Sequence, residues 1–138
     1  MKLSQTLLMS LIAVVFTKPI FADFNDGWNE YSNGNYNQAL KEWMPLANQG
    51  DGLAQFNLAG LYSKGYGVKI DDEEAFNWFK KSAEQGIAKA QYNVGVMYLN
   101  AIGVDKSYSE AKYWLNLSYE NGIKDAEVLW NKHKLWNH

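Results

Sequence analysis

Few side chains in this sequence are of the types that carry out catalysis, and their spacing favours no reaction. The 138 residues include no Cys and only two His, His133 and His138, both close to the carboxyl end. No His pair has metal-ligand spacing, and no Cys nucleophile is available. The serine motif Gly-x-Ser-x-Gly is also absent. The sequence therefore predicts no catalytic residue, no metal site and no cofactor.

A short acidic run, residues 71–74, is the other group of side chains that invites a chemical interpretation. A calcium site would need oxygens that converge in a looped geometry. The start of a helix favours negative charge without any metal. We therefore expect a structural role for Asp71 and its neighbours.

Two asparagines suit binding better than catalysis. Asn57 and Asn93 lie one sequence period of 36 residues apart. An Asn amide can donate to a peptide carbonyl and accept from its N–H group, so recurring Asn residues could follow an extended peptide. Alternatively, they could bond the backbone of a neighbouring helix and hold the stack in register.

The first 22 residues have the pattern of a secretory signal. Lys2 precedes the apolar run Leu7–Phe16, which is too short for a membrane span of about 20 residues. Ala22 precedes a polar, acidic segment, so cleavage is expected after it. We expect a signal peptide at residues 1–22, a mature chain of residues 23–138 without a stable membrane span, and a periplasmic or secreted location in a bacterial envelope.

Charge excludes further classes of function. The chain contains no Arg, and loss of residues 1–22 would leave eleven Lys against fifteen acidic residues, a net charge of −4. Nucleic-acid binding needs a basic stripe, and an anionic membrane surface also attracts basic segments. We therefore expect neither a nucleic-acid partner nor an anionic lipid surface.

The 36-residue period predicts the architecture. Ala54–Leu58 returns as Ala90–Val94, and three further sets share the spacing: Ala39, Ala75 and Ala111; Gly50, Gly86 and Gly122; Gly67 and Gly103. Such a period is typical of stacked supersecondary units. Without disulfides, the stack must be held by packing, for which six Trp, nine Tyr and six Phe are available.

Each full unit is expected to be a helix pair. Asn35, Asp71 and Ser107 are candidate amino-terminal caps of the second helices, each followed three residues later by Gln or Glu. Gly86 and Gly122 are expected to end these helices with a left-handed residue. Trp43, Trp78 and Trp114 are expected to pack between units.

The two ends of the repeat array are irregular. In the first unit the long loop is replaced by a tight turn at residues 33–35, and Pro45 is expected to kink the second helix. The segment 124–138 begins like a fourth unit and is expected to be a closing helix. We place the units at about 24–51, 52–87 and 88–123.

Residues 54–86 and 90–122 resemble the Sel1-like repeat, and residues 25–50 resemble the related tetratricopeptide unit. The resemblance rests on Ala90–Tyr98, on Gly103-Val104, on Ala111 with Trp114, and on Glu120–Gly122. It implies an all-α fold, an α/α right-handed superhelical solenoid of about three helix-turn-helix repeats with a carboxyl-terminal capping helix. It also implies protein–protein interaction on a concave face.

The same resemblance places the first helix of each pair on that face. The predicted partner-binding residues are Asn29, Phe56, Asn57, Lys64, Lys89, Tyr92, Asn93 and Asn100. The partner would be a protein or peptide, such as an envelope protein or a toxin, and the chain would serve as an adaptor, scaffold or inhibitor. A cysteine-rich branch of the family suggests an alternative, an enzyme or binder of cell-wall fragments or β-lactams, but its cysteines are absent here. Self-association through the open ends of the stack is a further alternative.

Overall fold

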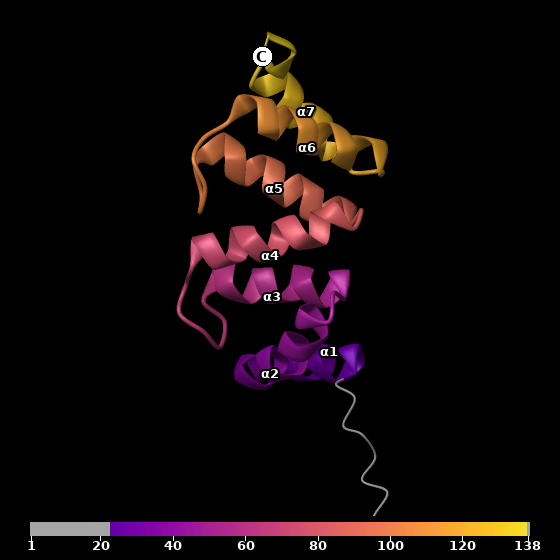
Figure 1. Ribbon diagram of the computed structural model, residues 1–138, viewed down its shortest axis with the longest axis vertical. Helices are drawn as coiled ribbons and strands as arrows, with labels where there is room; N and C mark the ends of the chain where they lie inside the picture. Colours follow the sequence, from indigo (N-terminus) through magenta and orange to yellow (C-terminus); the bar gives the residue numbers. More distant parts are fainter. Residues whose placement is uncertain (1–22, 138) are drawn as a thin grey trace, which may run out of the picture.

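The computed structural model describes residues 23–137, apart from the side chain of Trp136, and within that range all regular secondary structure is helical (Figure 1). The predicted signal peptide and His138 lie outside the described residues. The helices are α1 (Phe24–Ser32), α2 (Tyr36–Asn48), α3 (Gly52–Lys64), α4 (Asp72–Glu84), α5 (Ala88–Asn100), α6 (Tyr108–Glu120), α7 (Asp125–Lys132) and the 3-10 helix η1 (Leu135–Asn137). The predicted all-α repeat solenoid is confirmed.

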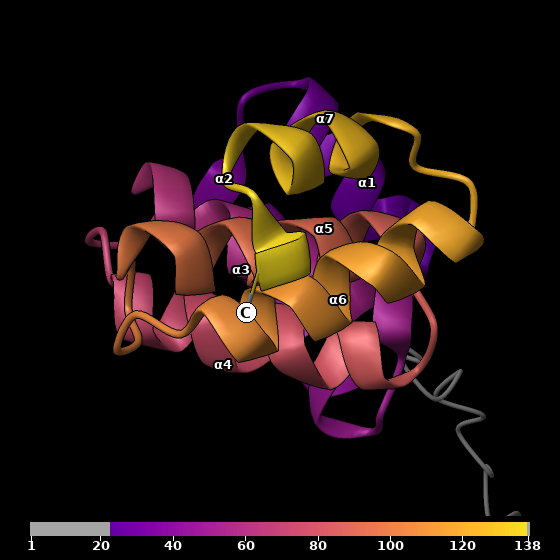
Figure 2. The same ribbon diagram turned by 90° about the horizontal axis from the view of Figure 1, so that it is seen from above.

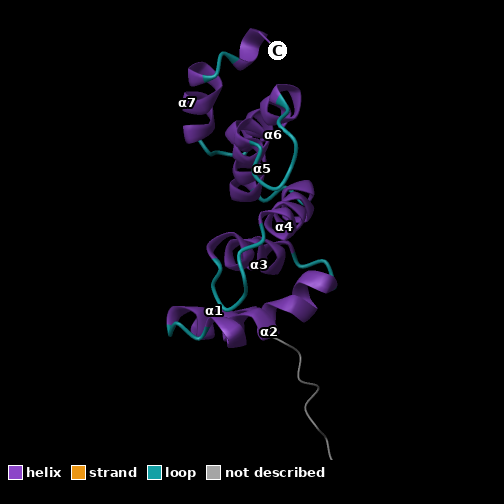
Figure 3. Cartoon of the chain, turned by 90° about the vertical axis from the view of Figure 1, so that its left-hand side faces the viewer, coloured by secondary structure: helices purple, strands orange, loops and turns teal. Residues whose placement is uncertain are grey.

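The helices form pairs that pile up along one axis. Viewed from above, the pairs overlie one another rather than lying side by side (Figure 2). In Figure 3, α1 lies to the left of α2, α3 to the left of α4, and α7 on the left side of the stack. The first helices of the units therefore share one face, as the repeat predicts.

Capping explains where the second helices begin. The Asp71 carboxylate accepts from Glu74 N at 3.0 Å, and Ser107 Oγ accepts from Glu110 N at 3.2 Å. Each bond satisfies an amide that the helix itself leaves unpaired. Asn35 stands at the same position of α2, but the prediction that its side chain caps the helix is wrong. Its amide donates instead to Glu30 Oε2 at 2.9 Å, because the tight turn brings the end of α1 beside it.

Glycines in the long loops allow each unit to dock on the preceding one. Gly67 and Gly103 both have positive φ, at 69° and 65°. A Cβ on Gly67 would meet the backbone of Tyr36, and one on Gly103 would overlap the backbone of Asp72. Each loop therefore lies against the start of the second helix one unit earlier. The first unit can dispense with a long loop because no unit precedes it.

Small residues bring the two helices of a unit together. Gly27 faces the indole of Trp43, and Gly95 faces the side chain of Leu115. Trp43 and Leu115 are two periods apart, so Trp43 occupies the position of Phe79 and Leu115 rather than that of Trp78. All three tryptophans of the second helices are buried, as expected. Pro45 lies within α2, which continues to Asn48.

Buried glutamines hold adjacent units in register. Gln55 Nε2 donates to the carbonyl of Ala47 at 3.0 Å, and Gln91 Nε2 donates to that of Ala83 at 3.2 Å. Within the second unit, the hydroxyl of Ser82 donates to the carbonyl of Gly52 at 2.7 Å. In the third unit, the hydroxyl of Ser118 makes the equivalent bond to the carbonyl of Ala88, and the Asn121 amide donates to Gln91 Oε1. The two glutamine bonds satisfy buried polar groups and so penalise a slip between units, whereas the other bonds fix the two helices within a unit.

An aromatic cluster stabilises the amino-terminal end. Its members are Phe24, Trp28, Tyr31, Tyr36, Trp43 and Tyr66. Tyr36 and Tyr66 stack with centroids 4.4 Å apart, which ties the second unit's loop to the first unit. Trp43 also donates its indole N–H to the carbonyl of Phe24 at 3.1 Å. Aromatic packing supplies here the cohesion that a small domain can otherwise take from disulfides.

The carboxyl-terminal end differs from the predicted single closing helix. The helix α7 stops at Lys132, and Lys134 adopts a positive φ of 51°. The chain then turns into η1, which buries Leu135 completely. Among the described residues no helix is long and apolar enough to cross a membrane.

Candidate binding surface

A hollow opens on the face made by the first helices. It has a volume of about 340 Å³ and lies between α1, α3 and the start of α5. We call it the α1–α3 hollow. Its lining consists of Phe24, Asn25, Trp28, Leu53, Phe56, Asn57, Ile87 and Lys89.

The walls of the α1–α3 hollow are mostly apolar, and two of the apolar side chains are exposed. Trp28 and Leu53 each expose 50% of their surface. Trp28 stacks on Tyr31 with centroids 5.5 Å apart, so its ring is held in place although it faces solvent. Phe56 packs edge-on against Phe79 at 5.6 Å. When a partner covers a preformed apolar wall of this kind, the burial of apolar surface favours binding.

Three polar side chains accompany this wall. The side-chain amides of Asn25 and Asn57 make no hydrogen bond to any other described residue. Lys89 is exposed and forms no ion pair within the described part of the chain. Both amides and the ammonium group are thus available to a partner.

The structure brings three of the eight predicted binding residues together. Phe56, Asn57 and Lys89 all line the α1–α3 hollow. Tyr92 and Asn93 are half-buried on α5, one period further along the face. The remaining three, which are exposed and line no part of the hollow, are Asn29, Lys64 and Asn100. Lys64 lies over the Tyr66 ring, and the Asn100 amide donates to the carbonyl of Val96.

Sequence reasoning missed Asn25, Trp28 and Leu53. The available signal was the small residue at each helix contact, since Gly27 matches Gly95 as the residue that faces the second helix. Alignment on these glycines makes Asn25, rather than Asn29, the equivalent of Asn57 and Asn93. Matching Tyr31 with Tyr62 instead shifts the first unit by one residue and makes Asp26 the equivalent of Asn57.

The alternative role considered for the asparagines belongs to other residues. Within the described residues, the side chains of Asn57 and Asn93 bond no neighbouring helix. Gln55 and Gln91, two positions earlier, hold the stack in register. The more buried amide of each pair is therefore structural, which leaves the half-buried amide free for binding.

One catalytic pattern escaped the sequence analysis. Ser109 and Lys112 have the Ser-x-x-Lys spacing at the start of α6. Ser109 is exposed, and its hydroxyl lies 3.1 Å from that of Ser107. The nearby amides of Glu110 and Ala111 are already bonded to Ser107, so neither serves as an oxyanion donor. No group of His, Asp and Glu in the described range could hold a metal ion.

Two tyrosines, the partly buried Tyr62 and the buried Tyr98, have raised pKa values. Burial raises the pKa of Tyr62 and of Tyr98, and the nearby carboxylates of Glu74 and Glu110, respectively, add to the effect. Both tyrosines occupy the same position of their repeat and pack against the core. Their raised values therefore reflect packing within the units rather than a reactive site.

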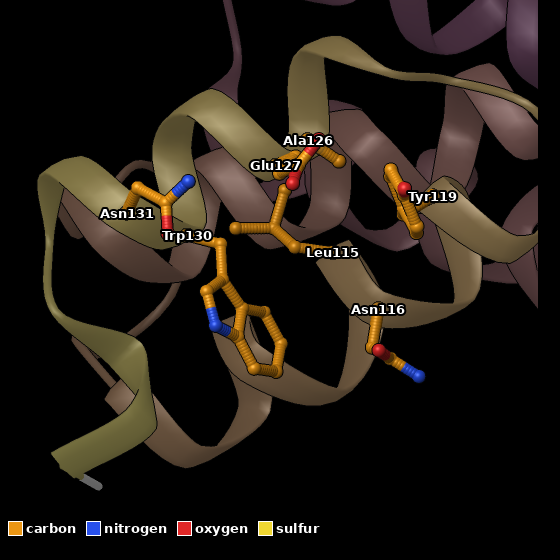
Figure 4. Close-up of a pocket in the computed structure, with 7 residues that line it drawn as sticks. All are labelled: Leu115, Asn116, Tyr119, Ala126, Glu127, Trp130 and Asn131. Atoms are coloured by element: carbon orange, nitrogen blue, oxygen red, sulfur yellow. The ribbon is translucent and has the colours of Figure 1, made fainter.

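A second hollow, of about 220 Å³, lies where α6 meets α7 (Figure 4). Trp130 and Asn131 border it from α7, and Leu115, Asn116 and Tyr119 border it from α6. The lining also includes Ala126 and Glu127. This hollow is a feature of the last junction of the stack and lies apart from the face that holds Trp28 and Leu53.

The stacked helix pairs and their exposed apolar face define an α/α repeat solenoid of the kind that presents a surface to other proteins. The chain belongs to the Sel1 repeat family, whose repeat matches residues 52–87 and 88–123. Proteins of this family are typically protein–protein interaction modules. No curated protein matches the chain.

Solved structures support the family assignment. A Sel1 repeat protein from Oxalobacter formigenes is similar over 77% of this chain, with 36% identity and a TM-score of 0.73. A protective antigen present in uropathogenic Escherichia coli strains, which displays an SLR fold, is similar over 76% of the chain, with 29% identity and a TM-score of 0.66. The matches span only 44% and 25% of those two chains, so both proteins are much longer than the region they share with this one.

Proposed function

We propose that this chain is an exported protein–protein interaction module, an adaptor or inhibitor that holds a segment of a partner protein on the face of α1, α3 and α5. The α1–α3 hollow carries the proposal, because it exposes half of Trp28 and half of Leu53 beside unbonded amides. Exposed aromatic and aliphatic anchors in a pocket are typical of the centres of protein interfaces.

Export is proposed from the sequence of residues 1–22. Their apolar run and the small residue Ala22 support cleavage before Asp23 and a periplasmic or secreted location. Expression of the full chain in a Gram-negative host, followed by fractionation and amino-terminal sequencing, tests this. The expected product is a periplasmic chain that begins at Asp23. Retention of Met1 on a cytoplasmic protein would contradict export.

A matched pair of variants tests the binding face. Leu53→Asp places a charge in the α1–α3 hollow, whereas Tyr113→Asp places one at an equally exposed apolar residue on α6. Purified residues 23–138 of each variant are used to capture proteins from an envelope extract, with circular dichroism to verify folding. We expect Leu53→Asp to lose its specific partner and Tyr113→Asp to retain it. Equal capture by both variants would rule out this face.

A further inference from the structure

The lining of the α1–α3 hollow has a chemistry that selects among possible partners. Lys89 is the one charged residue of its eight lining residues, and no acidic side chain lines the hollow. A volume of about 340 Å³ stands at the low end for ligand sites, which suits one large side chain rather than a whole folded surface. The α1–α3 hollow is therefore mainly apolar and has a single positively charged side chain, Lys89, in its lining.

The apolar part and the charge come from different units. Trp28 lies on α1 and Leu53 on α3, whereas Lys89 lies on α5. One period beyond Leu53 and Phe56, the chain has Lys89 and Tyr92, so the face becomes more polar along the stack. A bound segment thus meets an apolar surface at one end and an ammonium group at the other.

We propose that the hollow binds a peptide segment in which a large apolar side chain is followed or preceded closely by a carboxylate. The apolar side chain packs against Trp28 and Leu53, and the carboxylate pairs with Lys89. In an extended segment, residues two apart point the same way and are separated by about 7 Å. The free amides of Asn25 and Asn57 bond the peptide backbone. This inference rests on the proposed function and specifies the chemistry of the partner.

A glycan is the competing occupant, since an exposed Trp can stack on a sugar ring. The lining favours the peptide, because five of its eight side chains are aromatic or aliphatic and only two are amides. A sugar presents many hydroxyl groups, which would be left without partners against such a wall. The glycan is therefore included below as an outcome that would contradict the proposal.

The test uses three blocked seven-residue peptides and isotope-labelled protein of residues 23–138. The first peptide contains one tryptophan and, two positions later, one aspartate, among glycine and serine. The second has lysine in place of aspartate, and the third has alanine in place of tryptophan. Binding is measured from chemical-shift changes of backbone amides. We expect the first peptide to shift the amides of Asn57 and Lys89.

Replacing tryptophan by alanine in the peptide should weaken binding at least tenfold, because an aromatic side chain loses its buried contact. Replacing aspartate by lysine should weaken it about two- to fivefold, as an exposed ion pair is modest. The variant Lys89→Glu should reverse the preference between the aspartate and lysine peptides. The control Lys64→Glu, on an exposed Lys outside the hollow, should leave the preference unchanged.

Three results would overturn the proposal. They are equal binding of the aspartate and lysine peptides to the unmodified protein, no binding of any peptide at about 1 mM, and tighter binding of chitotetraose than of the first peptide at the same amides. These outcomes can be separated from failure of the proposed function. If Leu53→Asp still abolishes capture of an envelope protein, the interaction module stands and only the assigned peptide chemistry falls.

Discussion

The junction between α4 and α5 and the junction between α6 and α7 occupy equivalent places in the repeat, yet they are built differently. In the first, Gln91 bonds the carbonyl of Ala83 and the helices meet over small residues. One period later, Tyr119 stands in place of Ala83 and Glu127 in place of Gln91. Trp130 and Asn131 likewise replace Val94 and Gly95.

These replacements explain the hollow of about 220 Å³ at the last junction. The larger side chain Tyr119 borders the hollow at the position where the inner junction buries Ala83. A Glu carboxylate cannot donate to a carbonyl, so Glu127 cannot repeat the bond that Gln91 makes. The difference teaches that register is enforced between the inner units and relaxed at the end, as terminal repeats generally show.

The largest expected effect is a difference in the free energy of unfolding between alanine substitutions at two glycines of positive φ. Gly103→Ala should destabilise the protein by about 3 kcal/mol, because the added Cβ overlaps the backbone of Asp72 as well as straining φ. Gly122→Ala, just before α7, meets open space and should cost about 1 kcal/mol from φ alone. Urea unfolding of residues 23–138 measures both. Equal losses would show that the inner loop does not dock on the preceding unit.

The second effect compares the two equivalent polar residues. Gln91→Ala removes the buried amide that donates to the carbonyl of Ala83 and accepts from the Asn121 amide, at a cost of about 2 kcal/mol. Glu127→Ala, at an exposed residue, should change the free energy of unfolding by less than about 0.5 kcal/mol. Denaturant midpoints of the two variants check the contrast. If Glu127→Ala lost as much stability as Gln91→Ala, the last junction would be held in register by its polar side chain as the inner one is.

The smallest effect depends on pH. Burial raises the pKa of Tyr98, whereas the equivalent residue of the last unit is the exposed Lys134. Since the unfolded tyrosine ionises near pH 10, this contribution to stability is complete below pH 10 and is lost as the pH rises toward the folded pKa. Tyr98→Phe should therefore lose less stability than the unmodified protein between about pH 9 and pH 11. Parallel losses in thermal unfolding over that range would contradict a raised pKa in the folded state.

The fold was largely predictable because its signals are local or repeated. Asp71 and Ser107 cap their helices through bonds to residues three positions away, and the period of 36 residues marks the equivalent helices. The capping pattern failed at Asn35. Asparagine is a suitable capping residue, but the tight turn directs the Asn35 amide to Glu30. The geometry of this turn depends on how α1 and α2 pack together, and the residue type at one position does not predict it.

The lining of the α1–α3 hollow was predicted only in part. Phe56, Asn57 and Lys89 were found because they lie on regular repeats, where the period assigns a face to each position. Trp28 and Asn25 were missed because the first unit is shorter, and its alignment depends on which residue contacts the second helix. That contact, between Gly27 and Trp43, is visible only in the packed structure.

The sequence by itself determined the helices, their pairing and the stacking of the pairs as repeats, because capping residues and small residues recur at a constant interval. Only the tertiary structure decided where the repeat leaves apolar surface uncovered. Exposure of Trp28 and Leu53 depends on how α1, α3 and α5 are spaced across three units. Burial is a property of neighbours in space, so a periodic sequence can assign a residue to a face without showing whether another residue covers it.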